Sequence, residues 1–172
     1  MTVVGAADRP ASPEASFNAL FARHYPAVFG YAARRVGRDE AGDATAEVFA
    51  VAWRRLGRVP AEPETLPWLY GVARKVLANQ ERAANRRSRL QAAATTAART
   101  EADPPGVAAL DVEAALLRLG GDDREVLRLA AWEELRPTEI AAVLGCSANA
   151  AAVRLHRARQ RLAAEMAAKD RS

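Results

Sequence analysis

The chain has 172 residues, of which half are hydrophobic and 27% are charged, a composition typical of globular proteins and not of disordered ones. Its net charge of +4 is modest, so the placement of the basic residues, rather than their total, has to indicate any nucleic-acid partner. A single cysteine, Cys146, excludes an intrachain disulfide, and with only two histidines in the chain we expect no metal site. There is no secretory signal and no apolar run long enough to cross a bilayer, so we expect a cytoplasmic protein without direct membrane insertion.

The first third of the chain predicts two helices after a disordered tail over residues 1–15. Apolar residues recur at helical spacing over 16–37, with Pro26 marking a kink or a restart. A second helix is predicted over 39–56, and its apolar face indicates that Trp53 is buried. No alternating pattern of the kind that predicts β-strands occurs anywhere, so we expect an all-α fold of two small helical domains.

The second helix carries two acids, Asp43 and Glu47, one turn apart on the side opposite its apolar face. Paired carboxylates can act as general acid and base, but neither has a histidine, a metal ligand or a pocket signal beside it. The chain also has no glycine-rich phosphate loop with a following Lys-Ser/Thr and no nucleophile motif. We therefore expect a protein contact at these acids, and a protein that is not an enzyme and takes no cofactor or small-molecule substrate.

A third helix, predicted over 67–89 after a proline-punctuated loop, is apolar in its first half and basic in its second. Arginines one turn apart can follow phosphates, and aromatic surfaces can accept unstacked bases, which favours a nucleic-acid platform. The alternative is an ordinary helix whose aromatic residues belong to the core and whose arginines face solvent. Residues 91–106 are expected to form a flexible linker or a frayed helical tail, so the first domain is predicted to span 16–90.

A second domain is predicted over 107–166, followed by a short tail over 167–172. Its first two helices meet at Gly120-Gly121. Asp122 followed by Glu125 resembles a capping box at the start of the second of these helices. The domain is therefore expected to begin with a helical hairpin.

The segment 137–162 predicts two further helices around a tight turn. Gly145 supplies the left-handed conformation that ends the first helix, and Ser147 is placed to cap the second. The second helix has one apolar stripe and a basic outer side, with no acid between Ile140 and Ala164. An ordinary helical hairpin with a solvated face is the alternative, but such faces usually alternate in sign. We therefore favour a DNA-reading helix-turn-helix.

Five segments, taken in order, carry a resemblance to a known family. They are FARHYPAVFGYAARRV (21–36), DEAGDATAEVFAVAWRRL (39–56), LPWLYGVARKVLANQERAANRR (66–87), DREVLRLAAWEEL (123–135) and EIAAVLGCSANAAAVRLHRARQRL (139–162). The ordered set resembles the extracytoplasmic-function (ECF) sigma factors, the compact class of bacterial sigma factor that carries regions 2 and 4. The resemblance covers most of the chain outside the tails and the linker.

The resemblance implies a protein that binds core RNA polymerase, recognises the −35 and −10 promoter elements and assists strand opening. The partners it implies are the β′ clamp helices and β flap of core RNA polymerase, promoter DNA and an anti-sigma factor. It places the clamp-helix contact at Asp43 and Glu47. It places contacts to the opened −10 strand at Arg74, Lys75, Asn79, Arg82, Arg86 and Arg87. It places contacts to the −35 element at Asn149, Val153, Arg154, His156, Arg157 and Arg159.

Several positions depart from the family pattern. Lys75 stands where an asparagine is common, which bears on the −10 base preference. Arg136 stands where a serine commonly caps the next helix, which leaves that cap weak or supplied by Thr138. Ala151 and Ala152 replace a larger aliphatic and a basic residue, so the recognition helix is thinner than in the usual pattern.

Two other classes of function stay open from the sequence alone. A free-standing helix-turn-helix regulator would bind duplex DNA by itself, usually as a dimer on a symmetric site. A helical enzyme or an interaction scaffold would show no dependence on DNA. We favour the sigma factor because both domains, and not only the second, are basic where that family contacts DNA.

Overall fold

All regular structure in the described part of the chain is helical, as the sequence predicts. The computed structural model describes residues 12–92 and 107–169, so the predicted linker beyond residue 92 lies outside the described residues. No helix in those two ranges is long and apolar enough to span a membrane. The elements are α1 (Pro13–Val36), α2 (Arg38–Arg54), the short 3-10 helix η1 (Leu56–Arg58), α3 (Thr65–Ala92), α4 (Val107–Arg118), α5 (Gly121–Ala131), α6 (Pro137–Leu144) and α7 (Ala148–Lys169).

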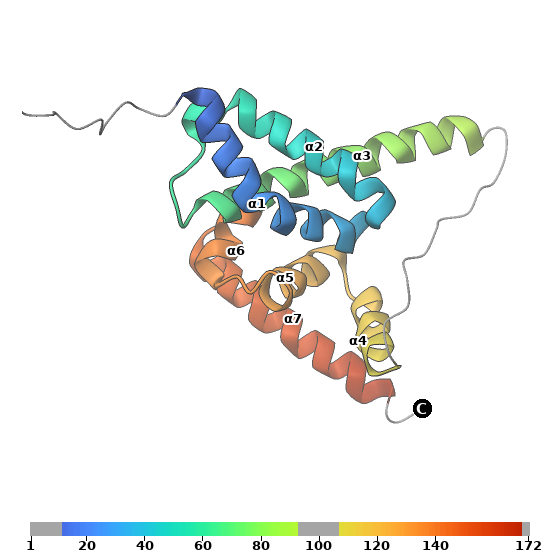
Figure 1. The fold of residues 1–172 in the computed structure, drawn as a ribbon. Helices are drawn as coiled ribbons and strands as arrows, with labels where there is room; N and C mark the ends of the chain where they lie inside the picture. Colours follow the sequence, from blue (N-terminus) through green and yellow to red (C-terminus); the bar gives the residue numbers. More distant parts are fainter. Residues whose placement is uncertain (1–11, 93–106, 170–172) are drawn as a thin grey trace, which may run out of the picture.

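Helices α1, α2 and α3 form the first domain, in which α1 packs along α2 (Figure 1). The Ser12 hydroxyl caps α1 by accepting a hydrogen bond from the Ala15 backbone N–H at 3.1 Å. Residues 13–15, which the sequence analysis assigns to the tail, are therefore helical. The helix passes through Pro26 without a restart and ends at Gly37, whose φ of 84° turns the chain into α2.

The core of the first domain takes apolar side chains from all three helices. Tyr31 of α1, Val48 of α2 and Leu69 of α3 are fully buried. Burial of this apolar surface is what holds the three amphipathic helices together. The exposed sides of α2 and α3 are thereby left to carry charged residues.

The prediction that Trp53 is buried is wrong. The residue is 43% exposed. It lies near the end of α2, where its ring meets Phe17 edge-on with the ring centroids 5.1 Å apart. The periodicity of α2 places Trp53 on the inner side of the helix. However, its ring contact is with Phe17 near the start of α1, and much of the indole remains in solvent.

The predicted helix-turn-helix is confirmed in α6 and α7. Gly145 ends α6 in the left-handed conformation with φ 68°, and the Ser147 hydroxyl accepts a hydrogen bond from the Ala150 backbone N–H at 3.1 Å. The apolar stripe of α7 is buried against α5 and α6, with Ala151 and Ala158 inaccessible to solvent. Helix α7 continues to Lys169, so residues 167–169 are helical and not part of a tail.

The capping box predicted at Asp122 and Glu125 is wrong. Helix α5 already begins at Gly121, so both acids lie inside the helix, and its N-cap has no side-chain hydrogen bond. Glu125 instead accepts hydrogen bonds from Tyr31 and Arg35 of α1. A guanidinium largely shielded from water is a stronger partner for a carboxylate than the backbone N–H of an exposed helix start.

The two domains pack directly against each other, a contact that the sequence analysis does not predict. Helix α3 packs against α6, and α5 lies close to α1 (Figure 1). A Cβ added to Gly71 of α3 would lie only 3.6 Å from the backbone of Val143 in α6. Buried apolar side chains of both domains form one continuous cluster, so the two domains share a core.

Helix α6 starts with a contact that replaces the serine cap expected from the family. The backbone N–H of Arg136 donates to Glu139 Oε2 at 2.8 Å, and its guanidinium binds both carboxylate oxygens at 3.1 and 3.0 Å. These hydrogen bonds from the side chain and backbone of Arg136 lower the pKa of Glu139. Glu139, rather than Thr138, therefore supplies the cap.

We expect Glu139→Ala to lower the free energy of unfolding by about 1 kcal/mol at neutral pH, because the variant loses the cap of α6. The pKa of Glu139 is lowered in the folded protein. Its contribution is therefore present above the usual carboxyl pKa and lost as the pH falls through the folded value. The difference from the wild type should therefore be smaller at an acidic pH, below the usual carboxyl pKa, than at neutral pH.

Urea unfolding of both proteins at the two pH values measures this difference. Thr138→Ala is the matched control, since it alters the neighbouring residue of the same helical turn without touching the Arg136–Glu139 contact. An equal loss of stability in Thr138→Ala would contradict the assignment of the cap to Glu139.

Candidate polymerase and nucleic-acid interfaces

The two acids predicted to contact polymerase lie on the exposed side of α2. Asp43 and Glu47 are both exposed, whereas Ala44, Val48 and Ala52 on the other side of the helix are buried. Glu47 Oε2 also accepts a hydrogen bond from the side-chain amide of Gln80 in α3 at 2.9 Å. Neither carboxylate forms an ion pair within the described residues, so both remain available to a basic surface on another protein.

Helix α3 carries a basic stripe of exposed residues on one face. The stripe consists of Lys75, Asn79, Arg82 and Arg86, which follow one another at intervals of four, three and four residues. The Arg82 guanidinium donates to Asn79 Oδ1 at 2.7 Å, so these two side chains are held side by side. Arg87 is exposed on the flank of the same helix. The structure therefore brings five of the six predicted −10 residues onto neighbouring exposed faces.

The sixth predicted −10 residue, Arg74, points toward the second domain. Its guanidinium lies 3.8 Å from Asp122 at the start of α5, and its side chain is half-buried. Asp122 is almost fully exposed, so this ion pair is weak. Among the described residues, Arg74 is the one member of the predicted −10 set that forms an ion pair with an acid.

All six predicted −35 residues are exposed on α7. The helical period places Asn149, Val153 and His156 opposite the buried stripe of the helix. The remaining residues lie on its two flanks, with Arg154 and Arg157 on one flank and Arg159 on the other.

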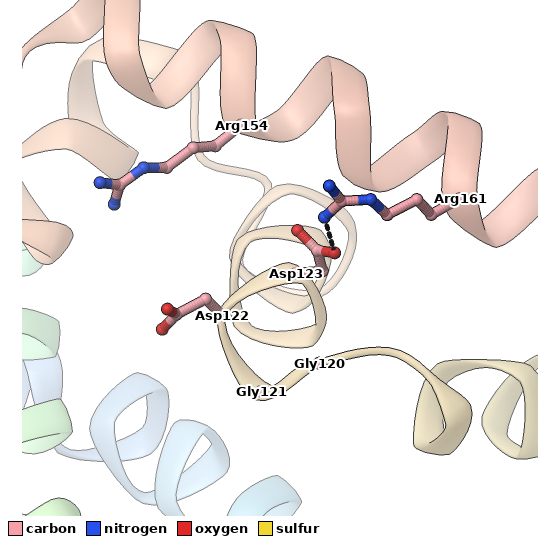
Figure 2. A pocket seen from close by; sticks show the side chains of 6 residues that line it. All are labelled: Gly120, Gly121, Asp122, Asp123, Arg154 and Arg161. Atoms are coloured by element: carbon pink, nitrogen blue, oxygen red, sulfur yellow. Dashed lines mark hydrogen bonds and ion pairs between the residues drawn. The ribbon is translucent and has the colours of Figure 1, made fainter.

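Acids at the start of α5 face one flank of this recognition helix. Figure 2 shows Arg154 and Arg161 extending from α7 on the side where Asp122 and Asp123 begin α5. Arg161 forms an ion pair with Asp123, whereas Arg154 has no hydrogen bond or ion pair among the described residues. Arg161 therefore helps to fix α7 on α5, and Arg154 keeps its donors free for an external acceptor.

The structure adds three arginines that the sequence analysis does not single out. Arg54, Arg55 and Arg58 line a hollow with Gly57, at the point where α2 ends and the loop to α3 begins. The pattern RRLGR at 54–58 is visible in the sequence, but helical periodicity alone does not indicate that the three side chains converge. Together they place positive charge beside the loop that precedes α3.

The loop between η1 and α3 is anchored by side chains at both of its ends. The Glu62 carboxylate contacts the buried His24 of α1, with His24 Nε2 and Glu62 Oε1 2.7 Å apart. The same oxygen lies 3.4 Å from Arg23 Nε. The Thr65 hydroxyl donates to the Pro60 carbonyl at 2.7 Å. These contacts fix the backbone that leads into the basic stripe of α3.

Two family models match the chain, one to each domain. Sigma-70 region 2 matches residues 20–87, which include the acidic side of α2 and the basic stripe of α3. Sigma-70, region 4 matches residues 109–162, which include the helix-turn-helix. The two matches together cover most of the chain.

Two curated relatives and one solved structure agree with these matches. RNA polymerase sigma factor CarQ of Myxococcus xanthus is 32% identical over 152 residues, which are 86% of this chain and 87% of CarQ. The probable RNA polymerase sigma factor RfaY of Xanthomonas campestris pv. campestris is 36% identical over 135 residues, 72% of this chain, and the match spans only 34% of RfaY. The sigma factor RpoE of Bartonella quintana, in complex with the anti-sigma factor NepR, has the same fold, with a TM-score of 0.67 at 23% identity over 87% of this chain and 96% of that one.

These matches cover the first domain as well as the helix-turn-helix. They therefore do not favour a free-standing regulator, which would be defined by its helix-turn-helix alone. They also agree with the order of elements predicted from the sequence. The chain belongs to the sigma-70 family of bacterial RNA polymerase sigma factors as an ECF-type member with regions 2 and 4, and so to the transcription initiation factors that bind core RNA polymerase and recognise promoters.

Proposed function

We propose that three exposed faces of the chain divide the work of a sigma factor between core RNA polymerase and the two promoter elements. The acidic side of α2 would bind polymerase, the basic stripe of α3 the −10 element, and the outer side of α7 the −35 element. The observation that carries the proposal is the segregation of charge. Acidic and basic side chains of a chain with net charge of only +4 lie on separate exposed faces of three helices.

Asp43 and Glu47 are proposed to meet the β′ clamp helices of core polymerase. Two exposed carboxylates one turn apart present a compact negative patch, which steers association with a basic surface and fixes its register. A second polymerase contact, to the β flap, is proposed for the second domain. Residues 16–90 and 107–166 are proposed as the two functional domains, with residues 91–106 as the connection between them.

The basic stripe of α3 is proposed to hold the opened non-template strand of the −10 element. Arg82, Arg86 and Arg87 would neutralise successive phosphates, since they repeat at about one helical turn. Lys75 and Asn79 lie nearer the loop that precedes α3, so they would meet the unstacked bases, and Arg74 would join them. Assisted strand opening follows because these contacts stabilise single-stranded DNA and not the duplex.

The recognition helix α7 is proposed to lie in the major groove of the −35 element. Asn149, Val153, Arg154 and Arg157 would meet base edges, where amide and guanidinium groups can pair bidentately. His156 and Arg159 would contact the phosphate backbone and set the position of the helix.

A sigma factor of this kind is proposed to act in the cytoplasm as a dissociable polymerase subunit without catalytic activity of its own. An anti-sigma factor is proposed as a further partner, because the fold is shared with a sigma factor whose structure contains one. Run-off transcription with purified core polymerase, with and without the chain, tests the whole proposal. Chain-dependent transcripts that share spaced −35 and −10 elements are expected, and failure of the folded chain to bind core polymerase would overturn it.

We expect Asp43→Lys combined with Glu47→Lys to weaken binding to core polymerase by at least about tenfold, because the variant turns an attractive patch into a repulsive one. Helix content should be preserved, since both side chains are exposed. Fluorescence anisotropy of the labelled chain against core polymerase, in the absence of DNA, measures the effect.

The control for this pair is Glu81→Lys combined with Glu134→Lys, which makes the same change in net charge at exposed positions outside α2. It should bind core polymerase as the wild type does. Equal weakening in both double variants would mean that total charge, and not the face of α2, governs the affinity.

We expect Arg157→Ala to reduce transcription from promoters with an intact −35 element by roughly tenfold, because one good base contact is lost. Discrimination between the intact element and its base substitutions should fall with it. Arg159→Ala is the matched control on the opposite flank of α7. It should lower transcription to a similar extent at every −35 sequence, as loss of a phosphate contact does. Unchanged discrimination in Arg157→Ala would remove its base-reading role.

A further inference from the structure

The two domains are joined by a cluster of charged and aromatic side chains that we call the arginine latch. It consists of Tyr31 and Arg35 of α1, Glu125 of α5 and Glu133, which follows α5. These are the most deeply buried ion pairs among the described residues. They connect segments about 90 residues apart in the sequence, so they form only when the domains are docked.

Arg35 uses three of its guanidinium donors to bridge the domains. Nε and one terminal nitrogen bind the two carboxylate oxygens of Glu125 at 3.0 and 3.1 Å, and the other terminal nitrogen binds Glu133 at 3.0 Å. The guanidinium carbon lies 3.4 Å from the centroid of the Tyr31 ring, and only 9% of the Arg35 side chain is exposed. A bidentate pair of this kind fixes the orientation of α5 on α1 as well as its distance.

The glutamates of the latch are also satisfied inside the molecule. The Glu133 side chain is 1% exposed and forms a second ion pair with Arg34. Glu125 accepts a further hydrogen bond from the Tyr31 hydroxyl at 2.8 Å, and Tyr31 stacks on Tyr70 of α3 with ring centroids 4.9 Å apart. Burial raises the pKa of both tyrosines, that of Tyr70 to about 12, as expected for a contact from which water is excluded.

We propose that the arginine latch holds the free chain in a closed form, and that this form must open before the two promoter elements can be bound at once. The second part rests on the proposed function. Elements named −10 and −35 lie roughly 25 base pairs apart, which is about 80 Å of duplex. A compact chain of this length is only about 40 Å across. In the closed form α3 contacts α6 and α6 contacts α7, so the two DNA-binding faces belong to one compact body.

In the closed form, the second domain also lies against the start of the α3 face that carries the basic stripe. Gly71, Lys75 and Asn79 follow one another at intervals of four residues, so they share one face of α3. Gly71 is packed against the backbone of α6, and Arg74 beside it is paired with Asp122 of α5. A strand bound along this face would therefore meet the second domain at its first turn.

The chemistry of the latch makes the closed form specific and reversible. The attraction within a buried ion pair is largely offset by the cost of removing both charges from water. Opening returns Arg35 and both glutamates to water together, so no charge is left buried without a partner. Loss of Arg35 alone is different, because the closed form would then keep Glu125 and Glu133 buried while the open form hydrates them. We expect such a variant to shift the equilibrium toward the open form by roughly 100-fold or more.

Distances between spin labels on the two domains test the closed form without polymerase or DNA. The full chain would carry Cys146→Ser with Ala46→Cys on α2 and Ala163→Cys on α7, both exposed positions, for double electron–electron resonance. This parent should give one narrow distance distribution. Arg35→Met should give a longer and broader one, with the helix content by circular dichroism unchanged.

Gly71→Leu opens the same interface by a different route. Its side chain would extend beyond the Cβ position that already lies 3.6 Å from the Val143 backbone, while leucine suits the interior of α3 at least as well as glycine does. Gly71→Ala is the matched control, because its Cβ makes only ordinary contact there and should leave the narrow distribution in place. If Arg35→Met fails to fold, Gly71→Leu still tests whether the docked domains give the narrow distance.

The outcomes separate the latch from the proposed function. A broad distribution in the parent would overturn the closed form. A parent-like narrow distribution in both Arg35→Met and Gly71→Leu would overturn the role of the latch in holding that form. Addition of core polymerase and a promoter fragment should lengthen the distance in the parent, and transcription that proceeds with the short distance retained would overturn the need to open. Failure to bind core polymerase in any form would instead contradict the proposed function, while the distances measured in the free chain would still decide whether the latch exists.

Discussion

The burial of one arginine determines how the two domains of this chain sit relative to each other. Arg35 extends from the last turns of α1 and is enclosed by two glutamates from the second domain and by the ring of Tyr31. Apolar contact between α3 and α6 could be satisfied at several neighbouring registers, since such contact has little directionality. The bidentate guanidinium–carboxylate pair accepts only one register. The apolar surface supplies attraction, and the arginine supplies the orientation of the second domain on the first.

This orientation explains how acidic residues can coexist with the two faces proposed to bind DNA. Most carboxylates near the basic helices are already paired within the molecule: Glu125 and Glu133 with Arg35, Asp123 with Arg161, and Glu139 with Arg136. Paired acids repel phosphate less than free ones do, so the outer side of α7 and the stripe of α3 keep a net positive field. Asp43 and Glu47 are the contrasting case, because they lie on the exposed side of α2 and form no ion pair within the part of the chain that the structure describes.

Local features of the sequence were sufficient to predict the helix-turn-helix, and nonlocal contacts explain where prediction failed. Gly145, Ser147 and the stripe that includes Ala151 act within a few residues, so sequence spacing alone indicates their roles. Glu125 fits a capping box equally well by spacing, but its partner Arg35 is 90 residues away and cannot be inferred from a local pattern. The predicted burial of Trp53 failed for a related reason. Helical periodicity indicates on which side of a helix a residue lies, but not how far a neighbouring helix extends over that side. The exposure of the proposed site residues followed from periodicity, whereas the engagement of Arg74 with Asp122 required the docked domains.

The ion pairs of the latch fix the closed form in one arrangement but add little net free energy to it, because their attraction is largely offset by desolvation. This changes what a regulatory partner has to do. A ligand shifts an equilibrium only by the difference between its affinities for the two forms. An anti-sigma factor that contacts both domains of a preformed closed chain would not have to supply the energy of bringing them together, so a small differential affinity is enough to hold it shut. Core polymerase and promoter DNA would act in the opposite direction, because the faces proposed to bind them would have to lie far apart. Hydration of the freed arginine and glutamates would offset part of the cost of separating them. The same buried ion pairs that define the closed form therefore keep the free-energy cost of opening it low.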